Sequence, residues 1–206
     1  MKVTDIKQQI KRKDRCSIFI DGKYSFALSE SGLLASGLKI GLELSNDDLE
    51  IQKQASVEDK GIYRVLDLIS RRPRSEGEIK DYLKRKKYSD EEIEKILNAL
   101  SIKGYIDDQN FARRWVENRR LLKPISTRKL WVELKQKKVS EEIIQQVLQN
   151  DETDEISVIE ELINTKSRQT RYQDKQKLLQ FLVRQGFNYG DIKQAFSNID
   201  SAESDI

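Results

Sequence analysis

Three segments of this chain repeat one pattern of apolar residues: IKDYLKRKKYSDEEIEKIL (79–97), LWVELKQKKVSEEIIQQVL (130–148) and LLQFLVRQGFNYGDIKQAF (178–196). The segments align on Leu83, Leu134 and Leu182. Each has an apolar residue four positions before this anchor and five, ten and fourteen positions after it. This spacing predicts a helix, a tight turn and a second helix in every copy. Units of this size bury little surface alone, so we expect each repeat to pack against its neighbours.

A further helix is predicted before each pair, at 61–70, 109–122 and 155–165, because apolar residues recur there at i, i+3 and i+4. Helix starts are indicated by Ser45 and by Ser-x-x-Glu capping boxes at Ser75 and Ser89. The sequence therefore predicts three tandem three-helix units in an elongated arrangement.

The first 45 residues follow a different pattern. Two β-rich runs, at 16–20 and 23–28, flank Asp21-Gly22, a pair that favours a type I′ hairpin turn. Val3, Ile6 and Ile10 suggest a third strand, and a short helix is expected from Ser29. The predicted fold is mainly α, with tandem three-helix repeats preceded by a small N-terminal β-hairpin or sheet extension. The predicted boundaries are 1–45 for the extension, 46–106, 107–150 and 151–200 for the repeats, and 201–206 for a tail.

Composition excludes several classes of function. The 206 residues include no histidine and one cysteine, which rules out His-based catalysis, imidazole zinc ligands and an intrachain disulfide. No glycine-rich phosphate loop is present. Asp107-Asp108 fits a helix N-cap better than an acid/base pair, and Trp115 and Trp131 fit a core better than a stacking platform. We expect a monomeric cytoplasmic protein with no catalytic activity, cofactor, metal or membrane segment.

Charge is uneven along the chain. Residues 61–150 carry 21 basic and 14 acidic side chains, a net charge of +7, whereas residues 1–60 are neutral and residues 151–206 carry −4. This asymmetry predicts a polyanionic or acidic partner for the middle of the chain. The candidate partner-binding residues are Arg71, Arg72, Arg74, Lys84, Arg85, Lys86, Lys87, Arg113, Arg114, Arg120, Lys123, Arg128 and Lys129.

These basic residues admit two interpretations. On helix 109–122, Phe111, Ala112, Trp115 and Val116 share one face, which leaves Arg113, Arg114, Glu117 and Arg120 mostly opposite. Any one of these basic residues, taken alone, is explained as part of a solvated helix face, with Arg113 and Glu117 as an i, i+4 ion pair. The clusters taken together favour a binding surface.

The segment KGYIDDQNFARRW (103–115) resembles the best-marked motif of the RecX family of recombination regulators, and RSEGEI (74–79) and residues 130–148 are similar to its first two repeats. The resemblance covers about residues 60–200. Lys123-Pro124-Ile125-Ser126 departs from it, since the family commonly has a Lys/Arg-Gly turn there. The resemblance implies a non-catalytic cytoplasmic protein that binds the RecA recombinase filament and usually inhibits strand exchange and coprotease activity.

An alternative is a non-specific DNA-binding protein, because helix–turn–helix units with basic clusters also dock in DNA grooves. The second helices of the first two repeats begin with Asp90-Glu91-Glu92 and Glu141-Glu142. Acids at this position repel phosphates, so sequence-specific reading of a groove is disfavoured. Non-specific DNA contact stays open.

Overall fold

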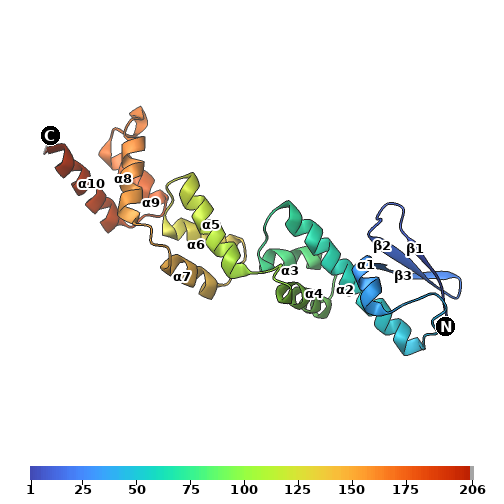
Figure 1. Cartoon of the computed structure of the whole chain (residues 1–206). Coiled ribbons are helices and arrows are strands. Elements are labelled where there is room, and N and C mark those ends of the chain that lie inside the picture. The colour runs from blue at the N-terminus through green and yellow to red at the C-terminus, as the bar shows by residue number, and fades with distance from the viewer. Residues whose placement is uncertain (205–206) are drawn as a thin grey trace. The chain divides into compact units, whose positions relative to one another are not determined.

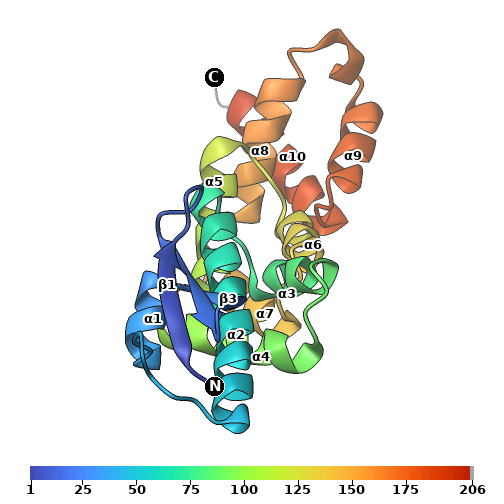
Figure 2. The same cartoon turned by 90° about the vertical axis from the view of Figure 1, so that its right-hand side faces the viewer.

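The protein is described by a computed structural model that covers residues 1–204 (Figures 1 and 2). Ten α-helices and three β-strands are present in that range, and well over half of the residues are helical, as predicted. The chain divides into two compact units. Unit 1 comprises residues 1–74 and 78–106, and unit 2 comprises residues 75–77 and those from Asp107 onward.

Unit 1 begins with an antiparallel sheet of β1 (Val3–Gln8), β2 (Arg15–Ile20) and β3 (Lys23–Ser29), in the order β1-β2-β3. Asp21 and Gly22 have φ angles of 48° and 80°, which confirms the type I′ hairpin. Ile18, Phe26 and Leu28 alternate along β2 and β3 onto the buried face. Ile10 was wrongly placed in the first strand, because β1 ends at Gln8 and Ile10 is 96% exposed.

Two helices cover the sheet. Ser29 caps the short α1 (Glu30–Ser36), as expected, and the capping box of Ser45 and Asp48 starts α2 (Asn46–Arg71). The predicted helix at 61–70 is therefore only the end of a 26-residue helix. This helix packs against both β3 and α4. A Cβ at Gly61 would lie 2.2 Å from Ile96 Cδ1, so glycine permits this close approach.

The three repeats form as predicted. The first combines the end of α2 with α3 (Glu76–Arg85) and α4 (Asp90–Ile102). The second consists of α5 (Asp108–Leu122), α6 (Thr127–Gln136) and α7 (Glu141–Gln149). The third consists of α8 (Glu155–Lys166), the 3-10 turn η1 (Thr170–Tyr172), α9 (Lys175–Arg184) and α10 (Tyr189–Ser204). Because α10 continues to Ser204, the predicted tail at 201–206 is helical up to that residue, and residues 205–206 lie outside the described chain.

The repeats share one turn geometry. The anchors Leu83, Leu134 and Leu182 are each 0% exposed in their cores, which confirms the alignment. Four residues after each anchor the backbone has a positive φ: 65° at Lys87, 62° at Lys138 and 91° at Gly186. A left-handed residue ends the helix and turns the following apolar side chain back onto the core. The same turn is thus built with lysine twice and glycine once.

Candidate partner-binding surface

The first basic cluster lies at the end of α2 and in the connection after it, and its three arginines are ion-paired. Arg71 lies 2.9 Å from Asp67, and Arg72 and Arg74 lie 2.7 and 3.5 Å from the same carboxylate, Glu78. The Glu78 side chain is 17% exposed, so this pair of arginines compensates a half-buried charge. Arg72 and Arg74 thereby fix the connection between α2 and α3.

The second cluster, Lys84–Lys87, lies at the end of α3 and is more open. Lys84 pairs with Asp90 at 3.0 Å, and the ammonium group of Lys86 lies 5.7 Å from the centroid of the Tyr82 ring. Arg85, Lys86 and Lys87 are exposed and form no ion pair with the described residues. These three cations at a helix C-terminus are available to a partner.

Helix α5 separates its arginines into two environments. Arg113 and Arg114 are exposed, and Arg113 makes the predicted i, i+4 pair with Glu117 at 3.9 Å. Arg120, which the sequence placed on the same open face, is only 11% exposed. It contacts Asp151 at 2.7 Å, Thr127 Oγ1 at 3.0 Å and the Ile125 carbonyl. The expected exposure of Arg120 is therefore wrong, because Asp151 after α7 draws its guanidinium inward.

A second internal network joins α5 to α6. Arg119 donates two hydrogen bonds to Glu133, at 2.6 and 2.8 Å, and Trp115 Nε1 donates a third at 3.0 Å. Burial by itself would raise the pKa of Glu133, but the hydrogen bonds from Arg119 and Trp115, together with the positive charges of Arg119 and Lys129, hold the pKa below its usual value. Trp115 thus packs in the core as predicted, whereas Trp131 is 39% exposed and the core prediction for it is wrong.

The last cluster lies around the start of α6. Ser126 caps this helix and donates a hydrogen bond to the Gln185 carbonyl of the third repeat at 2.7 Å, and Lys129 Nζ donates to Gln185 Oε1 at 2.8 Å. Lys129 therefore joins two repeats. Lys123 and Arg128 are exposed, and neither forms an ion pair with a described residue.

Several of the predicted basic residues thus offer no free charge to a partner. The structure does bring Arg72 together with Arg74, and Arg120 with its partners around α6, but these cations are already neutralised or buried. Arg71, Lys84 and Arg113 are exposed but ion-paired. The predicted residues that are exposed and form no ion pair with a described residue are Arg85, Lys86 and Lys87 in unit 1 and Arg114, Lys123 and Arg128 in unit 2.

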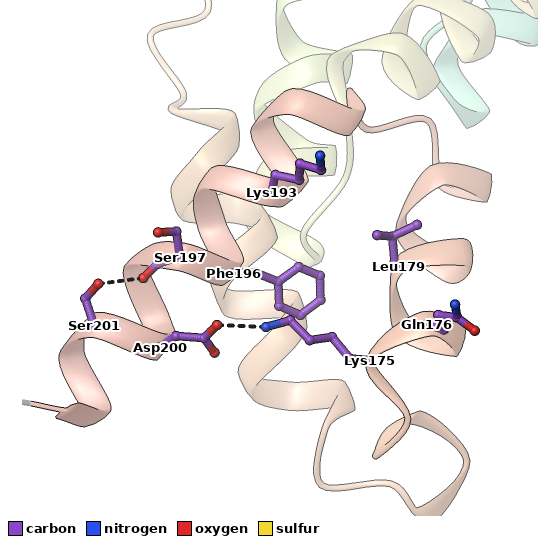
Figure 3. A pocket seen from close by; sticks show the side chains of 8 residues that line it. All are labelled: Lys175, Gln176, Leu179, Lys193, Phe196, Ser197, Asp200 and Ser201. Carbon is purple, nitrogen blue, oxygen red and sulfur yellow. Dashed lines mark hydrogen bonds and ion pairs between the residues drawn. The ribbon is translucent and has the colours of Figure 1, made fainter.

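A hollow of about 880 Å³ lies between α9 and α10 of the third repeat (Figure 3). Leu179 faces it from α9 and Phe196 from α10, while Lys175 lies with its ammonium group 4.9 Å from the Phe196 ring centroid and 2.7 Å from Asp200. Lys193 also lines the hollow and lies 4.8 Å from the Tyr189 ring centroid. The hollow is therefore apolar inside and basic at its edge.

The equivalent positions of the first two repeats carry different residues. In the first, Lys80 and Glu94 occupy the positions equivalent to Leu179 and Lys193 and form an ion pair at 2.7 Å. In the second, the equivalent residues are Trp131 and Gln145, and they line a smaller hollow of about 330 Å³.

At a second pair of positions, ion pairs in the first two repeats are replaced by exposed apolar or aromatic side chains in the third. Lys84–Asp90 in the first repeat and Lys135–Glu141 in the second are ion pairs, at 3.0 and 2.6 Å. The equivalent residues of the third repeat are Val183 and Tyr189, which are 46% and 52% exposed. In the first repeat, two ion pairs join the second and third helices across the face between them. In the third repeat both of these pairs are absent from the equivalent positions and the exposed side chains there are apolar, although the separate pair Lys175–Asp200 joins α9 to α10. We call the third-repeat version, formed by Leu179, Val183, Tyr189 and Phe196, the apolar face.

Within the described chain, no group of three or more acidic or cysteine side chains is arranged to hold a metal ion. Asp107 instead caps α5 by accepting a hydrogen bond from the Asn110 backbone at 2.9 Å, as the sequence predicted. No helix in the described residues has the length and apolar character needed to cross a membrane.

Four family models match consecutive parts of the chain: the regulatory protein RecX N-terminal domain at 1–45 and the first, second and third three-helix domains of RecX at 63–100, 107–148 and 156–196. The chain belongs to the RecX family. Regulatory protein RecX of Listeria monocytogenes serotype 4a is 34% identical, over 100% of this chain and 80% of that protein. The RecX of Bacillus licheniformis is 32% identical, over 98% and 79%.

Solved structures agree with this assignment. A crystal structure titled regulatory protein RecX has a TM-score of 0.73 and 28% identity, and the match covers 94% of this chain and 98% of that one. RecX from Lactobacillus salivarius has the same fold, with a TM-score of 0.65 over 71% of this chain.

The apolar face of this RecX family member was not predicted from the sequence, where the charge pattern pointed to the basic clusters. A signal for it was present, however. In the aligned repeats, the position three residues before the anchor changes from Lys80 to Trp131 to Leu179, although it lies outside the shared apolar pattern. An apolar residue at a position that another repeat fills with lysine indicates an exposed contact surface.

Proposed function

We propose that this chain is a regulatory protein without catalytic activity that binds the RecA recombinase filament and inhibits its recombination and coprotease activities. It acts in the cytoplasm as a monomer. Membership of the RecX family and the resemblance of residues 74–148 to its repeats support this proposal.

The apolar face is the observation that carries binding to a protein. Burying exposed apolar side chains against a protein partner stabilises the complex, whereas contact between these side chains and phosphates stabilises a complex little. Val183 and Tyr189 take the place of ion pairs that the first two repeats retain. Lys193 and Arg184 lie beside them and form no ion pair with a described residue, so the face favours an acidic protein surface.

The experiment is cosedimentation of the full chain with RecA filaments formed on single-stranded DNA, with DNA alone as the reference. The test variant is Val183→Asp/Tyr189→Asp, and the matched control is Leu34→Asp/Ile40→Asp, since those residues are also exposed. Burying the exposed half of each side chain gives about 1 kcal/mol, so the test variant should bind at least about tenfold more weakly. The proposal would be contradicted if the chain sedimented equally with DNA alone and with filaments, or if both variants lost the same amount of filament binding.

Non-specific DNA contact is a second candidate, favoured by the exposed Arg113 and Arg114. Against groove binding, Asp90, Glu91 and Glu92 do occupy the first turn of α4. We expect Arg113→Gln/Arg114→Gln to reduce the slope of log K against log salt by about 0.7 for each phosphate of single-stranded DNA that the variant no longer neutralises. An unchanged slope would exclude these arginines from DNA binding.

A further inference from the structure

Unit 1 contains a hollow of about 530 Å³ between the sheet and α2, and none of the predicted basic-cluster residues lines it. Five cationic side chains line it. Arg12 comes from the connection between β1 and β2, Arg15 from β2, and Lys53, Lys60 and Arg64 from α2. We call this the basic hollow. No carboxylate is among the described residues that line it.

The fold gathers these cations for simple geometric reasons. Positions 53, 60 and 64 are separated by seven and four residues, so they lie on one face of α2. Ser56 on the same face donates a hydrogen bond to the Ala27 carbonyl of β3 at 2.9 Å, which holds the helix face against the hairpin. The two arginines then come from the opposite wall.

Arg15 is the deepest of the five and is only 4% exposed. Its Nη2 donates to the Ala27 carbonyl at 2.9 Å and lies 3.2 Å from Asp59, which also accepts hydrogen bonds from the backbone and hydroxyl of Ser29. Its Nη1 is buried and has no hydrogen-bond acceptor among the described residues. A buried donor of a charged group without an acceptor is costly, so an anion that reaches Nη1 would be favoured.

Few of the positive charges are compensated. Lys53 pairs with Glu50 at 2.7 Å, and Arg15 shares Asp59. Arg12 lies over the Tyr63 ring, and Arg64 donates to the Tyr88 hydroxyl at 3.3 Å. Neither of these arginines, nor Lys60, has a carboxylate of the described chain within 4.0 Å. Such a concentration of like charge is unfavourable unless an anion occupies it.

We propose that the basic hollow is a binding site for phosphate groups. Arginine presents paired N–H donors that match phosphate oxygens, and lysine adds point charges, so the five side chains suit this ligand. The phosphate comes either from a small molecule, such as a nucleotide, or from the backbone of a nucleic acid. This site goes beyond the proposed filament binding and does not depend on it.

The experiment is isothermal titration of the full chain, at low and at physiological salt, with three probes: inorganic pyrophosphate, ATP without magnesium, and a single-stranded oligonucleotide. The test variant is Arg12→Gln/Lys60→Gln, which removes two cations at the rim. The control, Lys23→Gln/Lys39→Gln, removes the same charge from exposed positions of unit 1 outside the hollow. Thermal melts accompany both. If the test variant melts early, the single substitutions Lys60→Gln and Lys39→Gln replace the pairs.

We expect the test variant to lose about tenfold in affinity and the control about twofold or less, because charge-assisted hydrogen bonds are lost only in the former. This difference with pyrophosphate or ATP supports the site and identifies a small-molecule source. The difference with the oligonucleotide alone supports the site and identifies a nucleic-acid backbone. Absence of binding by all three probes at low salt, or equal losses in both variants, overturns the proposal. Because filament cosedimentation is a separate measurement, a failure of the proposed filament binding can be told apart from a failure of the phosphate site.

Discussion

We expect Arg120→Ala to destabilise the second repeat strongly. The guanidinium and the Asp151 carboxylate are each 11% exposed and lie 2.7 Å apart. Removing one partner of a buried pair costs about 3–5 kcal/mol, since the remaining charge is left uncompensated. Thr153 also donates to Asp151, from Oγ1 at 2.6 Å, and this places the expected loss near the lower end of that range, at about 3 kcal/mol.

Arg113→Ala is the matched control on the same helix. Its ion pair with Glu117 is 3.9 Å long and its side chain is 67% exposed, so its loss should change the unfolding free energy by less than about 0.5 kcal/mol. The double variant Arg120→Met/Asp151→Leu should recover much of the loss, because a buried ion pair can often be replaced by apolar side chains without cost.

The assay is urea unfolding followed by tryptophan fluorescence. The two tryptophans of the chain, Trp115 and Trp131, both lie in the second repeat, so the signal reports that repeat directly. Agreement within about 0.5 kcal/mol between Arg120→Ala and Arg113→Ala would refute the reasoning. It would show that Arg120 and Asp151 do not stabilise one another in solution.

Three further predictions use the same assay. Leu134→Ala should cost about 2–5 kcal/mol because its side chain is 0% exposed, whereas Val132→Ala, at 41% exposure, should cost far less; similar values would contradict the core assignment. Ser126→Ala should cost about 1–2 kcal/mol, since both a helix cap and the hydrogen bond to Gln185 are lost, and an unchanged midpoint would mean that neither matters. Because the pKa of Glu133 is held below its usual value, its carboxylate stabilises the folded protein at pH values above the usual pKa. The contribution is lost as pH falls through the folded-state pKa, so the deficit of Glu133→Gln at pH 7 should shrink on acidification; a deficit independent of pH would exclude this linkage.

The sequence alone determined the features that depend on neighbouring residues. Asp21-Gly22 fixed the hairpin because its backbone requires positive φ angles, and Ser45 and Ser89 fixed helix starts because their side chains accept backbone N–H groups three residues away. The repeat was readable for the same reason. Its apolar positions follow the period of a helix, and their burial needs only a partner helix of the same unit.

Tertiary structure decided which charges remain free. Arg113 and Arg120 are equivalent in a helical projection, yet Asp151, 31 residues from Arg120, draws only that arginine into the interior. Four of the five cations in the basic hollow, Arg12, Arg15, Lys53 and Lys60, come from residues 1–60, which carry no net charge, so a count of charges along the chain gave no sign of it. Neutralisation of a charge depends on distance in space and on burial, and both are set by contacts between segments far apart in the chain.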